Sequence, residues 1–248
     1  MYYIQLNGQI IAYEKSGFGP CPLLLLHGNG EDHHIYDELV KVVDPQKFTI
    51  YAIDSRGQGG SAEARDLHYL NMALDVSRFI TSLELENVLL VGFSDGGIIA
   101  LILASLHPDM AGGLICCGAN RTPKGLTRKA LHEIKSAYKK DHSPLTAMML
   151  KEPNLLDRDL QRIPAPVLVL AGENDLIRKE ETEAIAKALP KGEMEILPGE
   201  THDSYVVHSE KLLPYINRIY KEIVNTGAFQ SEIHSIDLDN VEDIEGIF

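Results

Sequence analysis

One glycine-flanked serine constrains this chain more than any other feature of its sequence. Ser94 lies in the heptad VGFSDGG, residues 91–97, between an apolar, β-branched run at 87–91 and a long apolar stretch at 98–106. Gly-x-Ser-x-Gly between a strand and a helix is typical of a nucleophile elbow, a turn too tight for large side chains two residues before or after the serine. The heptad therefore predicts a strand, a sharp turn that exposes Ser94, and a helix.

Two later segments supply the groups that activate a serine, in the chain order serine, acid, histidine. Asp175 follows a predicted buried strand at 166–171, and His202 follows a strand at 193–197 and a glycine-containing loop. The carboxyl ends of parallel strands meet at one edge of an open sheet, where ligands bind. The pattern therefore predicts that Ser94, Asp175 and His202 meet there as nucleophile, acid and base.

Other residues of suitable chemistry are weaker candidates. Glu173 would replace the acid only if its loop were shifted, and His208 is expected inside a helix over residues 205–224. Asp95 as the nucleophile would put Phe93 where the tight turn demands a small residue. The sequence therefore favours the serine as the attacking residue.

These motifs resemble those of the α/β-hydrolase superfamily, over about residues 1–225. The segment LLLLHGNG at 23–30 is similar to the family's third strand and oxyanion loop, and DSRGQGGS at 54–61 is similar to the loop after its fourth strand. The resemblance implies an α/β-hydrolase fold, with a mostly parallel eight-stranded sheet, helices on both faces and a small helical cap insertion. It also implies an oxyanion hole made by the backbone N–H groups of Asn29 and Asp95.

The alternation of apolar runs and amphipathic segments predicts the same architecture. We expect strands near residues 2–6, 9–13, 22–26, 48–53, 87–92, 113–118, 166–171 and 193–197. We expect helices near residues 35–43, 70–84, 96–106, 179–189 and 205–224.

The domain organisation expected is one core with a single insertion. The core covers residues 1–120 and 165–225, and the cap covers 121–164. Residues 226–248 depart from the family pattern: from Ser231 onward they carry 6 acidic residues and no lysine or arginine. We expect a solvated acidic tail, with packing of its apolar residues on its own domain or on a second subunit as the alternative.

Charge and composition exclude several classes of partner. A net charge of −13 argues against nucleic acid and anionic membrane surfaces. No apolar run reaches the roughly 18 residues that a membrane helix needs, and the amino terminus has no signal-peptide pattern. Cys21, Cys116 and Cys117 are an odd number of cysteines and predict reduced, buried thiols in a cytoplasmic protein. The protein is expected to be a monomer or a homodimer, and the sequence does not choose between them. No phosphate-binding loop or dinucleotide fingerprint is present, so no cofactor is expected.

The carboxylate of Asp95 raises an electrostatic problem beside a developing oxyanion. At about 5 Å the repulsion is roughly 3 kcal/mol for an effective dielectric of 20. The carboxylate must therefore point away, be paired, or meet a cationic substrate group. The elbow is similar to that of valacyclovir-hydrolase-like enzymes, and this resemblance implies that the Asp95 carboxylate contacts a substrate ammonium. We favour the alternative, a structural carboxylate that the helix dipole stabilises.

Residues around the site are assigned by chemistry and position. The pocket is expected to be lined by Phe93, Tyr36, Tyr138, Met148 and Met149. The chain has no tryptophan and only 6% aromatic residues, so a short acyl group is expected.

Two further clusters are given structural roles. Arg56 and Asp54 are expected to form an ion pair or a loop clamp. His33 and His34, next to Asp32, are expected at the rim or surface, with no metal.

The function predicted is that of a cofactor-independent serine hydrolase that cleaves a small carboxylic ester or thioester. An amino-acid ester hydrolase, a C–C bond hydrolase and a perhydrolase share the same triad and stay open. A ligand-binding or signalling protein on the hydrolase fold is the alternative of another class.

Overall fold

Eight strands form one sheet in the computed structural model, which describes residues 1–227. Their order across the sheet is β1-β2-β4-β3-β5-β6-β7-β8. β2 pairs antiparallel with β1 and with β4, and the other pairs are parallel. The predicted mostly parallel eight-stranded sheet is therefore confirmed. The strands are β1 (Tyr2–Leu6), β2 (Gln9–Gly17), β3 (Cys21–Leu26), β4 (Phe48–Ile53), β5 (Val88–Phe93), β6 (Ala111–Cys117), β7 (Val167–Asn174) and β8 (Gly192–Thr201).

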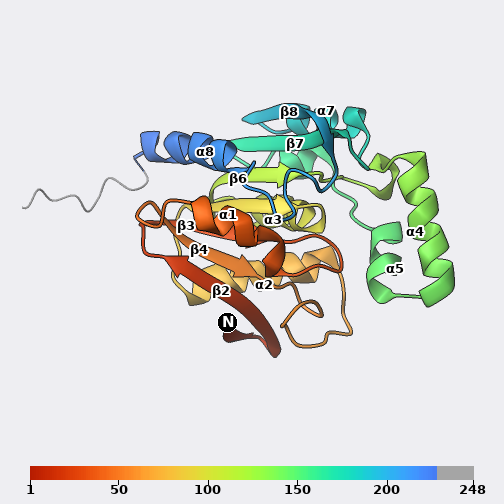
Figure 1. Cartoon of the computed structure of the whole chain (residues 1–248), viewed down its shortest axis with the longest axis horizontal. Coiled ribbons are helices and arrows are strands. Elements are labelled where there is room, and N and C mark those ends of the chain that lie inside the picture. The colour runs from red at the N-terminus through yellow and green to blue at the C-terminus, as the bar shows by residue number, and fades with distance from the viewer. Residues whose placement is uncertain (228–248) are drawn as a thin grey trace, which may run out of the picture.

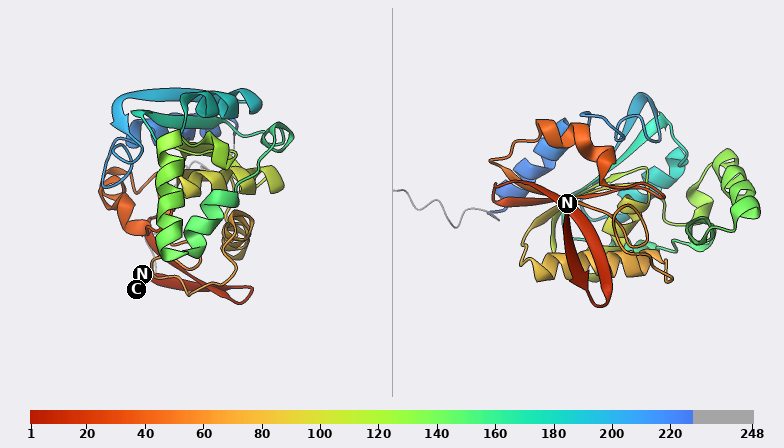
Figure 2. Two further views of the ribbon diagram at one scale, coloured as in Figure 1. Left: turned by 90° about the vertical axis from the view of Figure 1, so that its right-hand side faces the viewer. Right: turned by 60° about the horizontal axis from the view of Figure 1, so that its bottom comes forward.

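Helices cover both faces of the sheet, which buries every residue of β3 and β5. Two apolar cores result, one beneath α2, α3 and α7 and the other beneath α1 and α8 (Figure 2). Cys116 belongs to the first core and Cys117 to the second, because neighbouring residues of a strand face opposite sides. The helices are α1 (Asp37–Val42), preceded by the 3-10 turn η1 (His33–Tyr36), α2 (Tyr69–Ser82), α3 (Asp95–Leu106), α7 (Lys179–Ala188) and α8 (Leu213–Asn225).

A helical insertion lies between β6 and β7, in the region predicted as a cap. Figure 1 shows α4 and α5 beside the sheet, at the opposite side from the end of α8. Arg121 ties the start of the insertion to α7, because its backbone N–H donates to Glu181 Oε1 at 2.7 Å. The insertion contains η2 (Pro123–Gly125), α4 (Arg128–Asp141), α5 (Pro144–Lys151) and α6 (Asp157–Leu160).

The last helix begins later than the predicted 205–224. Residues 205–208 form a turn, because the N–H groups of Val206 and Val207 both donate to Asp203 O at 2.9 Å. His208 has a φ of 49° and donates its N–H to Ile35 O, so a helix cannot pass through it. The prediction that His208 lies inside a helix is therefore wrong.

The loop after β4 is clamped to α2 by a buried ion pair. Arg56 donates from Nε and Nη2 to the two oxygens of Asp75 at 2.6 and 2.7 Å. Asp54 instead accepts the backbone N–H groups of His33 and Gly60. Of the two roles expected for Arg56 and Asp54, the loop clamp is therefore found, and an ion pair between them is not.

Every helix within residues 1–227 falls short of the length and apolar character that crossing a bilayer requires.

The predicted acidic tail lies outside the described residues, apart from positions 226 and 227.

Candidate active site

Ser94 occupies a strained backbone turn between β5 and α3. Its φ of 51° and ψ of −112° are unfavourable for a residue with a side chain. The turn is held because Ser94 N–H donates to Cys117 O at 2.7 Å and Ile98 N–H donates to Ser94 O. A Cβ on Gly92 would lie 2.2 Å from Gly96 O. The structure therefore forms the sharp turn that the heptad predicts.

A chain of hydrogen bonds joins the three residues predicted as nucleophile, base and acid. His202 Nε2 lies 3.1 Å from Ser94 Oγ, and His202 Nδ1 lies 2.6 Å from Asp175 Oδ1. The Asp175 side chain is only 2% exposed and also accepts the N–H groups of Gly172 and Ile177. This anchoring fixes the carboxylate that orients the imidazole.

The alternative acid and base lie elsewhere. Glu173 is exposed and accepts the backbone N–H of Gly199, within β8. His208 lines a different hollow, beside α1. Neither is part of the hydrogen-bonded chain that contains Ser94.

The two predicted oxyanion donors belong to loops that a side-chain hydrogen bond connects. Asn29 Nδ2 donates to Asp95 Oδ2 at 2.8 Å, across 66 positions of sequence. On either side of Asn29, Gly28 N–H donates to Glu31 Oε2 and Gly30 N–H donates to a glutamine side chain. The oxyanion loop is therefore held against the start of α3 by contacts that the motif alone does not reveal.

His27, a buried histidine, hydrogen-bonds the predicted oxyanion loop. His27 is 1% exposed, and its Nδ1 lies 2.7 Å from Gly28 O while its Nε2 accepts Ser55 N–H at 2.9 Å. Both bonds need one protonated and one bare nitrogen. Burial lowers the pKa of His27, which keeps the ring in that neutral form.

The Asp95 carboxylate is buried and paired. It is 3% exposed, and it accepts the hydroxyl of Tyr69 at 2.7 Å and the amide of Asn29 at 2.8 Å. Burial raises the pKa of the Asp95 carboxyl, and these two hydrogen bonds oppose that rise. Of the three arrangements that would avoid repulsion of an oxyanion, the structure therefore shows a carboxylate paired with protein donors.

A small pocket of about 120 Å³ opens at Ser94. Residues of α4 at the helical spacing 130, 133 and 134 form one wall, so the insertion covers the site. The pocket is lined by Tyr69, Ser94, Asp95, Asn120, Leu126, Ala130, Glu133, Ile134, Met149, Glu152, Leu176, Ile177 and His202.

Of the five side chains predicted to line the pocket, Met149 does so. Tyr36 is wholly buried in the core beneath α1, where its hydroxyl donates to a backbone carbonyl, Leu26 O. Phe93 packs on the ring of His202, with 4.9 Å between centroids. Met148 points into the core, and Tyr138 packs on another cap residue, His142. The pocket assignments for these four are therefore wrong.

Two acidic residues that sequence reasoning missed also line the pocket. Glu133 and Glu152 join Asp95 in its lining, and the described lining residues include no lysine or arginine. Glu133 shares one face of α4 with Ala130 and Ile134, so helical periodicity in the cap was the available signal. The pocket therefore carries a negative potential beside the serine.

Comparison with known proteins places this architecture among the α/β hydrolases. Residues 22–141 match the model of the alpha/beta hydrolase fold. The serine hydrolase BPHL of Homo sapiens is 24% identical over 82% of this chain and 80% of its own length. A thermophilic esterase from Thermogutta terrifontis superposes with a TM-score of 0.74 at 22% identity, covering 90% of this chain and 99% of that one. A carboxylesterase from Nitrososphaera gargenis gives 0.76 at 14% identity, covering 91% and 100%.

The elbow geometry predicts that alanine substitutions at two neighbouring glycines reduce stability to different degrees. A Cβ on Gly96 would lie 2.0 Å from Leu26 O, so Gly96→Ala should reduce the free energy of unfolding by about 3 kcal/mol. A Cβ on Gly97 would lie 3.0 Å from the Ala119 methyl and 3.1 Å from Gly92 O, which shifts of a few tenths of an ångström relieve, so Gly97→Ala should change it by less than about 1 kcal/mol. Urea unfolding of both variants tests this, and equal stability would contradict the proposed packing.

The neutral state of His27 predicts an acid-linked loss of stability. Below pH 6.5, the ordinary pKa of histidine, His27 is protonated in the unfolded chain. It stays neutral in the folded chain, because its pKa is lower there. The unfolding free energy should therefore fall with decreasing pH from about 6.5, with a contribution from His27 approaching 1.4 kcal/mol per pH unit. Unfolding curves between pH 7 and 5 measure the slope, which His27→Asn should reduce. An unchanged slope would contradict the assignment.

Proposed function

We propose that this chain, which belongs to the α/β-hydrolase superfamily, cleaves small carboxylic esters or thioesters through an acyl-enzyme, without a cofactor. The observation that carries the proposal is the hydrogen-bonded chain from Asp175 through His202 to Ser94, at the mouth of a pocket. Relatives named serine hydrolase and esterase support a hydrolase acting on esters.

The first half of the reaction forms the acyl-enzyme. Ser94 Oγ attacks the ester carbonyl carbon while His202 Nε2 takes the hydroxyl proton. Asp175 holds the proton on His202 Nδ1 and stabilises the imidazolium. The tetrahedral intermediate then collapses, its C–O bond to the alcohol breaks, and the imidazolium returns the proton to the leaving oxygen.

The second half repeats these steps with water. His202 takes a proton from water, whose oxygen attacks the acyl carbon, and the acid product leaves as Ser94 recovers its proton. In both halves the backbone N–H groups of Asn29 and Asp95 would donate to the oxyanion. Removal of one such donor typically costs about 3 kcal/mol of transition-state stabilisation.

An α-amino ester is the second candidate substrate, favoured by the acidic pocket. Asp95, Glu133 and Glu152 line the pocket beside Ser94. Glu152 is paired with His68 and also accepts the backbone N–H of Tyr69. Both oxygens of Asp95 already accept hydrogen bonds, so it contributes its field, while Glu133 is exposed at the pocket wall. A substrate ammonium would be attracted to this set of charges.

Removal of the nucleophile should abolish turnover and leave the fold unchanged. Ser94→Ala should lower kcat/KM for p-nitrophenyl acetate at least about a thousandfold, because no other group then attacks the ester. Ser82→Ala, on the exposed end of α2, should retain full activity. A fluorophosphonate should label wild-type protein at Ser94. If the wild type shows no labelling and no turnover, the result favours a ligand-binding protein on this fold.

The size of the pocket predicts a preference for short acyl chains. Its 120 Å³ is small beside the about 300–1,000 Å³ of sites for drug-sized ligands. Along a series of p-nitrophenyl esters, kcat/KM should be highest for acetate to butyrate and decline beyond. An optimum at eight carbons or longer would contradict the predicted size limit.

The charge of the pocket predicts faster cleavage of α-amino esters than of their des-amino analogues. Glu133→Gln should reduce that preference roughly threefold or more, since it removes one pocket charge. The matched variant Glu180→Gln, exposed on α7 outside the pocket, should leave it unchanged. Equal kcat/KM for both esters in the wild type would rule out recognition of the ammonium.

A further inference from the structure

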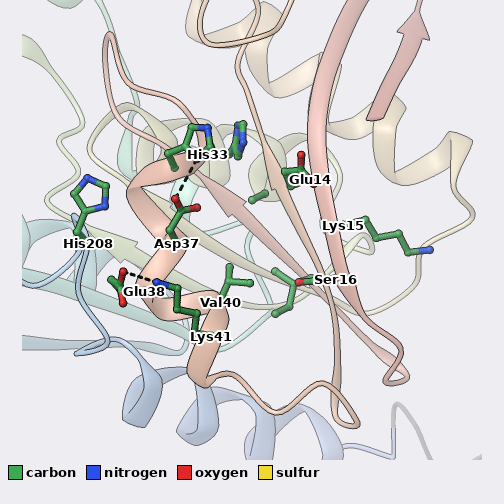
Figure 3. Close-up of a pocket in the computed structure, with 12 residues that line it drawn as sticks. Glu14, Lys15, Ser16, His33, Asp37, Glu38, Val40, Lys41 and His208 are labelled. Atoms are coloured by element: carbon green, nitrogen blue, oxygen red, sulfur yellow. Dashed lines mark hydrogen bonds and ion pairs between the residues drawn. The ribbon is translucent and has the colours of Figure 1, made fainter. Parts of the chain in front are cut away.

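A second hollow, of about 600 Å³, lies away from the triad beside η1 and α1 (Figure 3). Its walls come from β2, β4, η1 and α1, with His208 on the far side. Glu38 and Lys41 form an ion pair on α1, and His33, His34 and Asp37 also line the hollow. The proposed hydrolase reaction uses none of these groups.

His33 is buried with one nitrogen unsatisfied. The expectation of a rim or surface position is wrong for this residue, which is 4% exposed. Its Nδ1 lies 2.8 Å from Asp54 Oδ1, and a carboxylate only accepts, so Nδ1 carries the proton. In the neutral imidazole Nε2 carries a lone pair, and Nε2 has no hydrogen-bond partner within the described residues. A buried lone pair of this kind calls for an electrophilic partner.

Two neighbouring side chains offer further ligand atoms close to His33. His34 Nδ1 pairs with Asp37 Oδ2 at 3.1 Å, which leaves its Nε2 as the second free imidazole nitrogen. The rings of His33 and His34 lie 4.1 Å apart between centroids. One ligand atom from each of Asp32, His33 and His34 lies within 4.8 Å of the others.

We propose that Asp32, His33 and His34 bind a divalent transition-metal ion of the zinc class. Two imidazoles and one carboxylate are a donor set that zinc accepts, whereas calcium and magnesium prefer oxygen ligands alone. Asp54 behind His33 and Asp37 behind His34 match the carboxylate–histidine–metal arrangement that orients such ligands.

Small side-chain rotations suffice to close the site. Zinc ligands at about 2.0–2.1 Å from the ion lie roughly 3.3 Å from one another. His33 is held by Asp54 and supplies the rigid ligand. The His34 side chain is 59% exposed, so it has space to move toward the ion. Asp32 accepts the backbone N–H of His34 through Oδ1 at 2.9 Å, which leaves its Oδ2 for the ion.

The bound ion would stabilise the segment that follows the predicted oxyanion loop. Asp32 follows Asn29 by three residues, and all three ligands lie between positions 32 and 34. Asp54 behind His33 connects this segment to the end of β4. This role is structural and leaves the chemistry to the triad.

Calorimetric titration of the metal-stripped full-length protein with Zn²⁺ tests the proposal. We expect one ion per chain, a higher melting temperature with the ion, and at least tenfold weaker binding in Asp32→Asn and in His34→Ala. These two variants change accessible side chains, so they report on binding where a substitution of buried His33 would also perturb folding.

Controls separate this site from other histidines. His132→Ala, on the exposed side of α4, and His202→Ala should both bind Zn²⁺ as the wild type does. Co²⁺ should give visible d–d absorption that His34→Ala removes. No binding, unchanged affinity in both Asp32→Asn and His34→Ala, or loss of the ion in His202→Ala would overturn the proposal.

Discussion

The backbone of Ser94 is the constraint on which the rest of the site depends. A φ of 51° on a residue with a Cβ costs of the order of 1–3 kcal/mol and persists only where the surroundings over-determine it. Here β5 and α3 approach so closely that Gly92 and Gly96 have no space for a side chain. The strained turn lifts Oγ out of the sheet, toward the loops that follow β7 and β8. Those loops carry the acid and the base, so the hydrogen-bonded chain follows from the elbow and from the parallel strand order.

Electrostatics decide how an acidic residue can occupy the position after the serine. Asp95 sits where an oxyanion is proposed to form, and its carboxylate is turned into the protein toward Tyr69 and Asn29. The amide of Asn29 thereby links the loop after β3 to the start of α3, the two segments that carry the proposed oxyanion donors. Under the proposed function, the remaining negative field would favour substrates with a positive group near the scissile bond.

Local patterns were enough to predict the sheet and the meeting of three side chains at its edge, because buried strands and tight glycine turns are properties of short segments. Side-chain direction was less predictable. Tyr36 is an aromatic residue close in sequence to the oxyanion loop, yet its hydroxyl finds a carbonyl within the core. The late start of α8 depends on a contact between His208 and Ile35, 173 positions apart, which no local pattern contains. His33 was misplaced for the same reason, since its burial depends on Asp54 from another strand end.

The covalent intermediate tests the central claim most directly. Rapid mixing with p-nitrophenyl acetate, acid quenching and intact-mass measurement should reveal one acetyl group per chain, with peptide mapping placing it on Ser94. Release of p-nitrophenol should show a burst of matching stoichiometry if deacylation is the slower half. Acetylation that maps to another residue, or turnover in which the wild type and a deacylation-impaired Asp175→Asn variant never carry an acyl group, would contradict the account.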